Sequence, residues 1–85
     1  MESGQYYFYL ARCSDGSLYA GSCVDLTARE AKHNSGKGAK YTSGRLPIRF
    51  VYSEKFNSRS EACQREAAVK RWTKARKEEL VTHDA

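Results

Sequence analysis

The sequence predicts an α+β fold, with a small, three-stranded, mainly antiparallel sheet flanked by helices in the order β-β-α-β-α-α. Three features carry this prediction: a strand-like apolar run at residues 6–13, a turn that folds it back, and two segments that begin with helix-capping residues. The 85 residues are expected to form one domain, with a core of about residues 5–82, because the chain is shorter than most domains.

Residues 6–13 are the first predicted strand. Both alternate sets of their side chains are mostly apolar, which is typical of a strand covered on both faces and indicates a central position. Residues 14–17 form a turn in which Gly16 can adopt positive φ. Residues 18–21 then return as a second strand, so the pair is expected to be a β-hairpin.

A helix is predicted from the N-cap Asp25 to about His33, with residues 34–36 ending it. Residues 35–47 are rich in Gly, Ser and Lys and are expected to form a basic surface loop. Residues 48–56 are the third strand, which the preceding proline can open.

The later helical segment begins with a capping box, in which Ser58 is the N-cap and Glu61 the third helical residue. This helix is predicted to run to about Trp72, and a short last helix to follow at about residues 74–81.

The composition favours an anionic partner and offers no support for a membrane or a disulfide framework. The net charge is +5 and the sequence pI about 9.3. No apolar stretch approaches the roughly 20 residues that span a bilayer, and the first residues lack a secretory layout, so a cytoplasmic protein is expected. The three cysteines show no C-x-x-C spacing and only two histidines exist, so neither a disulfide framework nor a zinc cluster is predicted.

Glu66 is the most informative single residue. Helical spacing places it on the stripe that contains Ala62, Val69 and Trp72, which is expected to face the core. A buried carboxylate needs a cation or several donors. From the pattern alone, a salt bridge to a neighbouring arginine (Arg29 or Arg65) and the ligation of a hard divalent ion remain equally open.

Two residue pairs are ordinary when each is taken alone. Arg29 and His33 lie one helical turn apart, and an exposed helix face explains them without any chemistry. Tyr9 and Tyr19 lie on adjacent predicted strands, where tyrosine pairs commonly serve packing. The combination and the order of these residues are what carry information.

Residues 7–9 and 19–21 together resemble the two motifs of the GIY-YIG nuclease family. Tyr-Phe-Tyr at residues 7–9 stands where the family has Gly-Ile-Tyr, and Tyr-Ala-Gly at residues 19–21 stands where it has Tyr-Ile-Gly. The exchanges leave Tyr9, Tyr19 and Gly21 in place. We interpret Gly21 as a position that permits close approach of other atoms to the backbone.

The resemblance continues along nearly the whole chain. Arg29 follows Gly21 by eight residues, His33 follows Arg29 by four, and Glu66 falls in the helix where the family places its metal-binding glutamate. Residues 13–19 and 36–42 are similar to a small stand-alone bacterial branch, whose members resemble the catalytic domain of a structure-specific nuclease.

The resemblance implies a hydrolysis of phosphodiester bonds assisted by one metal ion. Glu66 would hold Mg²⁺ or Mn²⁺, and Arg29 would bind the scissile phosphate. One of Tyr9 and Tyr19 would deprotonate the attacking water and the other would orient it, while His33 would position the nucleophile or relay its proton. A free tyrosine has a pKa of about 10, so this role requires a nearby cation.

The basic loop supplies the expected contacts to nucleic acid, which are Lys37, Lys40, Tyr41 and Arg45. Contacts of this kind to the phosphate backbone are independent of base sequence. The resemblance implies a structure-selective endonuclease, with DNA favoured over RNA and a role in repair or recombination. Two alternatives stay open: a nucleic-acid-binding module that needs a partner to cut, and a basic adaptor in which the same residues only stabilise the fold.

Overall fold

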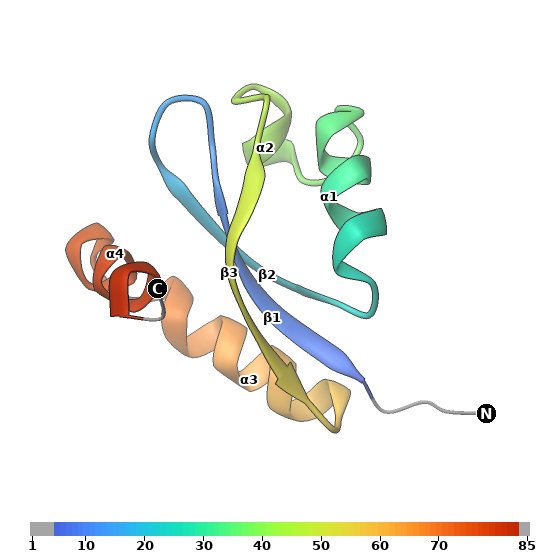
Figure 1. Cartoon of the computed structure of the whole chain (residues 1–85), viewed down its shortest axis with the longest axis vertical. Coiled ribbons are helices and arrows are strands. Elements are labelled where there is room, and N and C mark those ends of the chain that lie inside the picture. Colours follow the sequence, from blue (N-terminus) through green and yellow to red (C-terminus); the bar gives the residue numbers. More distant parts are fainter. Residues whose placement is uncertain (1–4, 84–85) are drawn as a thin grey trace.

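The computed structural model describes residues 5–83, and Figure 1 shows the path of the chain. Its elements are β1 (Tyr6–Arg12), β2 (Leu18–Cys23), α1 (Leu26–Asn34), α2 (Lys40–Ser43), β3 (Arg49–Phe56), α3 (Arg59–Lys70) and α4 (Lys74–His83). The predicted α+β class with a three-stranded antiparallel sheet is confirmed.

The sheet has the strand order β2-β1-β3, and both pairs of neighbours are antiparallel. The predicted central position of the first strand is therefore confirmed. In the β1–β2 register Tyr9 lies opposite Gly21, and Ala11 lies opposite Tyr19. Because side chains alternate along a strand, Tyr9 and Tyr19 project from the same face of the sheet as diagonal neighbours.

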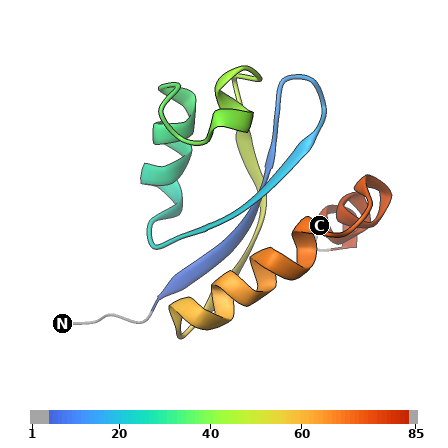
Figure 2. The ribbon, with the colours of Figure 1, turned by 180° about the vertical axis from the view of Figure 1, so that it is seen from behind.

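Helices cover both faces of the sheet, α1 and α2 on one side and α3 and α4 on the other (Figures 1 and 2). The buried cluster on the α1 side consists of Tyr9, Ala11, Cys13, Cys23 and Ile48. The buried cluster on the α3 side consists of Phe8, Leu10, Ala20 and Val69. Apolar side chains on both faces of β1 therefore form two cores that share one strand.

The predicted N-cap residues Asp25 and Ser58 are confirmed, but of the predicted capping box only the Ser58 half forms, because the Glu61 carboxylate does not bond the Ser58 N–H. The Asp25 carboxylate accepts a hydrogen bond from the Ala28 backbone N–H at 3.0 Å, and the Ser58 hydroxyl accepts one from the Glu61 N–H at 3.1 Å. The exposed helix face that could have explained Arg29 and His33 is not observed, because Arg29 is half-buried, as are Leu26 and Glu30, and His33 is fully buried. The Asp25 cap and these inward side chains orient α1 across the sheet.

The predicted loop at residues 35–47 is partly wrong, because it contains the short helix α2. This segment is tied to the hairpin turn by a hydrogen bond from the Ser14 N–H to the Arg45 carbonyl at 2.9 Å. Four residues are too few to show helical periodicity, so local sequence carries no signal for α2. Its position is set by tertiary contacts.

Element ends also differ from the predictions by a few residues. The second strand continues to Cys23, and the last helix continues to His83. The third helix ends earlier, at Lys70, where the Trp72 N–H bonds the Val69 carbonyl and closes the final turn. The indole ring of Trp72 then packs against the second core.

The three cysteines are free thiols, as predicted, with Cys13 and Cys23 buried and Cys63 exposed. Among residues 5–83, no helix is long and apolar enough to cross a membrane.

Candidate active site

The buried part of the site is a chain of three hydrogen-bonded side chains. The Tyr9 hydroxyl lies 2.8 Å from His33 Nε2, and His33 Nδ1 lies 2.8 Å from Thr42 Oγ1. Each of the three side chains is at most 2% exposed. They come from β1, α1 and α2, so the chain joins three separate elements.

The bonds of Thr42 determine the tautomer of His33. Thr42 Oγ1 donates its single proton to the Ala39 carbonyl at 3.0 Å, so it accepts from His33 Nδ1–H. His33 Nε2 is then unprotonated and accepts the Tyr9 hydroxyl proton. The pKa of His33 is lowered mainly by burial, and the charges of Arg29 and Lys32 lower it further. The neutral ring that these hydrogen bonds require is therefore favoured.

Two glycines make room for this chain. A Cβ atom on Gly21 would lie 2.4 Å from the Tyr9 hydroxyl oxygen, and one on Gly38 would lie 2.3 Å from His33 Nδ1. The expected close approach at Gly21 is therefore present, and the approaching group is the ring of Tyr9. Gly21 belongs to the motif because a side chain there would displace the phenol.

Tyr9 does not meet the requirement for an easily ionised phenol. Burial raises the pKa of Tyr9, and the Tyr19 side chain raises it further, while the Arg29 guanidinium lowers it only in part. Tyr9 is 1% exposed and its ring stacks on Phe50 with centroids 4.1 Å apart. Tyr9 thus holds its proton and donates it to His33.

Tyr19 is the half-buried phenol of the pair. Its ring meets the edge of His33 with centroids 5.6 Å apart, and it stacks on Tyr41 at 5.9 Å. Lys70 Nζ lies 5.8 Å from the centroid of the same ring. Tyr19 therefore connects the buried chain to the basic loop and to α3.

Arg29 and Glu66 are brought together by one residue of β2. The Arg29 guanidinium donates to the Ser22 carbonyl at 3.4 Å, and the Ser22 hydroxyl donates to Glu66 Oε1 at 2.7 Å. Arg29 has five N–H donors, so this bond leaves most of the fork available. An anion bound to the free N–H groups of Arg29 would lie near the Ser22 hydroxyl and the Glu66 carboxylate.

The predicted environment of Glu66 needs correction. Glu66 lies at the margin of the buried stripe, with its side chain 21% exposed, and its ionic partner is Lys70, whose Nζ lies 2.9 Å from Oε2. The predicted alternatives for the salt bridge are wrong, because Arg65 pairs with Glu54 at 2.9 Å and Arg29 binds the Ser22 carbonyl. The bond to Glu66 raises the pKa of Lys70 above its usual value.

The two sets of residues meet across the free edge of β2. Tyr19 projects to the α1 side of the sheet, whereas the neighbouring Ser22 side chain reaches Glu66 on α3, which covers the opposite side (Figures 1 and 2). Since β2 is an edge strand, no further strand separates the two sides. Lys70 spans this edge, bonding Glu66 and lying over Tyr19.

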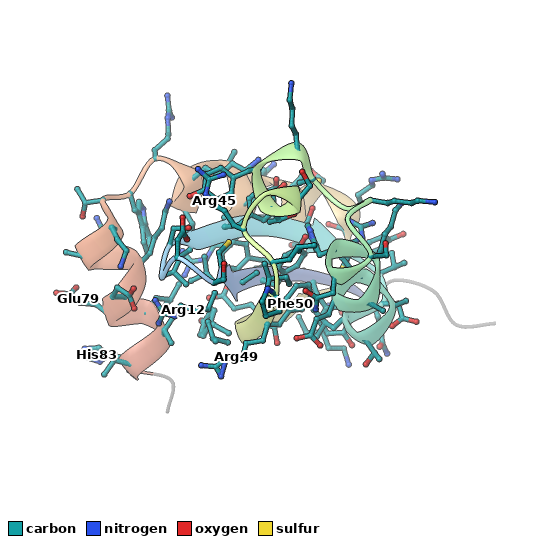
Figure 3. All side chains as sticks on the ribbon, turned by 90° about the horizontal axis from the view of Figure 1, so that it is seen from above. Arg12, Arg45, Arg49, Phe50, Glu79 and His83 are labelled. Atoms are coloured by element: carbon teal, nitrogen blue, oxygen red, sulfur yellow. The ribbon has the colours of Figure 1, made fainter. Side chains whose placement is uncertain are left out.

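The four predicted nucleic-acid contacts differ among themselves, and Tyr41 is the one that stacks on Tyr19. Lys37 and Lys40 are exposed, and Tyr41 is 40% exposed. Arg45 stacks over the Tyr41 ring at 3.9 Å and pairs with Asp15 at 3.0 Å (Figure 3 shows its position). Arg45 therefore orients Tyr41 and shares its charge with a carboxylate, while the two lysines present unshared charge.

The donor set at Glu66 fits a magnesium-type ion. Within residues 5–83 no group of three or more His, Cys, Asp or Glu could hold a metal, so such a site would rest on the Glu66 carboxylate with the Ser22 hydroxyl beside it. Mg²⁺ is commonly held by one or two carboxylates together with waters and substrate phosphate. A single, partly buried carboxylate that shares Ser22 with Arg29 matches that pattern.

Three residues of the site were not predicted from the sequence: Ser22, Thr42 and Lys70. Ser22 and Thr42 act through contacts distant in sequence, for which no local signal exists. Lys70 follows Glu66 by four residues, the spacing of a helical ion pair, and this signal was present.

Comparison with known proteins identifies the family of the chain. The family model of the GIY-YIG catalytic domain matches residues 5–79, so the chain belongs to the GIY-YIG nuclease superfamily. Its relatives are UPF0213 proteins, a small stand-alone GIY-YIG family. One from Bacillus pumilus is 50% identical over 78 residues, covering 92% of this chain and 80% of that protein. One from Staphylococcus aureus is 46% identical over 76 residues, covering 89% and 93%.

Two solution NMR structures are similar as well. The UPF0213 protein of Bacillus halodurans has a TM-score of 0.59 and 46% identity, with 92% of this chain and 83% of that chain covered. A protein from E. faecalis has a TM-score of 0.62 and 42% identity, with 96% and 88% covered. Fold and sequence similarity therefore agree.

Proposed function

We propose that this protein is a metal-dependent endonuclease that hydrolyses phosphodiester bonds in DNA and selects substrates by structure. The observation that carries the proposal is the meeting of Arg29, Ser22 and Glu66 with the Tyr19–His33–Tyr9 group at the edge of β2. The match to the GIY-YIG catalytic domain supports a nuclease, and the net charge of +5 suits a nucleic acid.

Arg29 binds the scissile phosphate. Its planar fork matches two phosphate oxygens, and it is held in place by the Ser22 carbonyl. The guanidinium offsets the negative charge that develops on the phosphate in the transition state. Because Ser22 also holds Glu66, this placement fixes the phosphate relative to that carboxylate.

Glu66 is the residue that would hold Mg²⁺ or Mn²⁺, with the Ser22 hydroxyl fixing one of its oxygens. Bound there, the ion would supply Lewis-acid stabilisation of the phosphate and the leaving oxygen. Lys70 now neutralises this carboxylate and must release it for the ion to bind.

Tyr19 orients the attacking water, because it is the phenol of the pair that solvent reaches. The water oxygen bonds to phosphorus, and the bond from phosphorus to one sugar oxygen breaks. The proton lost by the water leaves to solvent through the Tyr19 hydroxyl, and the departing sugar oxygen takes up a proton from solvent to become a hydroxyl. His33 has both ring nitrogens bonded within the protein and therefore acts as a positioning residue for Tyr19. Tyr9 fixes His33 in turn.

Cleavage of flapped, nicked and branched DNA with and without Mg²⁺ tests the proposal. Glu66→Gln and Arg29→Ala are each expected to reduce metal-dependent cleavage by at least about 100-fold, the scale of removing one group that stabilises the transition state. Glu61→Gln is the matched control, because Glu61 is an exposed carboxylate of the same helix. If Glu66→Gln cuts as fast as Glu61→Gln, the proposal fails. Binding without turnover in the parent would instead indicate a binding module.

A further inference from the structure

A cavity of about 280 Å³ adjoins the candidate active site. It lies between the end of β2, α1 and the first turns of α3, and Ser22 and Arg29 line it. Those two residues also belong to the group that meets Glu66. A ligand in this cavity would therefore be continuous with one bound at Glu66, and the volume is close to the lower end of about 300 Å³ for ligand pockets.

The charge of the cavity is positive. Arg29 and Arg59 line it, and among residues 5–83 no carboxylate does. Several other arginines are paired with carboxylates, namely Arg12 with Glu78, Arg45 with Asp15 and Arg65 with Glu54. Within residues 5–83 Arg59 has no ion pair or side-chain hydrogen bond, so its guanidinium is available to an anion such as a phosphate.

The remaining wall of the cavity is apolar. Ala62 is 1% exposed and Cys23 is 8% exposed, so both form a floor, and Val24 stands at the rim with 63% of its surface exposed. Val24 and Tyr41 are the exposed large hydrophobic residues in the described part of the chain. Each lies beside the candidate site, Val24 next to the Ser22–Arg29 side and Tyr41 on Tyr19.

We propose that this cavity binds an unpaired nucleotide next to the cleaved phosphate, with its phosphate on Arg59 and its base against Val24. The proposal rests on the proposed function and adds the substrate class to it. A base within a continuous duplex is stacked between its neighbours and cannot enter a cavity without unstacking. The cavity therefore selects DNA in which the nucleotide at this position is free, as in a flap, a gap or a single strand.

Binding measured without turnover tests this assignment. Fluorescence anisotropy in EDTA gives the dissociation constants for a continuous duplex, for the same duplex with a 5′ or a 3′ flap, and for the single strand. Arg59→Ala is expected to weaken binding of the better flap by about tenfold, the worth of one charge-assisted hydrogen bond. Its effect on the duplex is expected to be much smaller, so the ratio of the duplex dissociation constant to the flap dissociation constant falls.

Arg49→Ala is the matched control. Arg49 is exposed and opens β3 opposite Arg12 (Figure 3), at the far end of the sheet from Val24, and it has no ion pair within residues 5–83. The Arg49→Ala substitution removes the same charge, so it is expected to weaken the binding of all the DNAs by one common factor. Val24→Ser, at an exposed position that packing does not constrain, is expected to lower the duplex-to-flap ratio of dissociation constants about fivefold without changing the salt dependence.

The assignment is overturned if the parent binds duplex as tightly as both flaps, or if Arg59→Ala and Arg49→Ala change the ratio equally. It is also overturned if Val24→Ser leaves the ratio unchanged. Metal-dependent cleavage with an unchanged ratio would leave the nuclease proposal standing and reject the cavity. A ratio that falls as expected in a protein that cuts no DNA would reject the nuclease proposal and keep the cavity.

Discussion

Gly21→Ala tests the close packing on which the buried part of the site depends. The added Cβ would lie 2.4 Å from the Tyr9 hydroxyl oxygen and 2.6 Å from Tyr9 Cζ. Carbon contacts are normally about 3.5–4.0 Å, so the ring must move by roughly 1 Å. Phe50 stacks against the ring and His33 holds its hydroxyl, so the ring has no open direction to move into.

The expected cost has two parts. Overpacking a well-packed core costs about 1–3 kcal/mol, and disturbing the bond from Tyr9 to His33 costs about 1 kcal/mol more. The total is about 2–4 kcal/mol in the free energy of unfolding, measured by urea titration with circular dichroism. For a domain of this size the melting temperature is expected to fall by roughly 10–25 °C.

Gly44→Ala is the control for this substitution. Nothing lies within 4 Å of a Cβ at Gly44, and its φ of −96° suits any residue, so alanine there is expected to be neutral or to stabilise by up to about 1 kcal/mol. Combining Tyr9→Phe with Gly21→Ala removes the nearest contact and is expected to cost less than the sum of the single changes. Equal unfolding midpoints for Gly21→Ala and Gly44→Ala would refute the reasoning.

Two further predictions concern the cation at Glu66 and the protonation of His33. Lys70→Met removes the cation that competes for Glu66, so the affinity for Mn²⁺, measured by electron paramagnetic resonance, is expected to rise about two- to fivefold, the worth of a partly exposed ion pair. Lys74→Met removes the same charge from α4 and is the control, for which a smaller rise is expected. Equal rises for the two variants would contradict the prediction. Because the folded pKa of His33 is lowered, the unfolded chain binds more protons below about pH 6.5, so stability is expected to fall as the pH drops through that value towards the folded pKa. Urea titrations at several pH values are expected to show this loss of stability in the parent and in the control His83→Gln. The loss is expected to be smaller in His33→Gln. An equal loss in His33→Gln would exclude His33 as the source of the pH dependence.

The elements that were predicted correctly are those whose own residues specify them. Apolar side chains on both faces of residues 6–13 indicated the central strand, and the strand order confirms it. Asp25 and Ser58 marked helix starts because their side chains bond the first free N–H groups. These signals act within a few residues and need no knowledge of the rest of the fold.

The details that were missed depend on contacts between distant residues. Thr42 fixes α2 by bonding His33, nine positions earlier, and a four-residue helix has no pattern of its own. Helical spacing placed Glu66 on the stripe with Ala62 and Val69, but spacing does not give the rotation of a helix on a sheet. A small rotation decides whether the carboxylate enters the core or reaches Ser22 at its margin.

The strand order itself accounts for the form of the site. Were β2 a central strand, another strand would lie between the α1 side and the α3 side, and Lys70 could not contact both Glu66 and Tyr19. An edge strand also leaves backbone groups without partners, which is a liability for pairing with other chains. Arg29 bonds the edge carbonyl of Ser22, so one side chain both covers the edge and faces the position where a phosphate would bind. The free edge of β2 is therefore a structural weakness that Arg29 helps to cover and, in the proposed function, the line where residues from the two helical layers act on one phosphate.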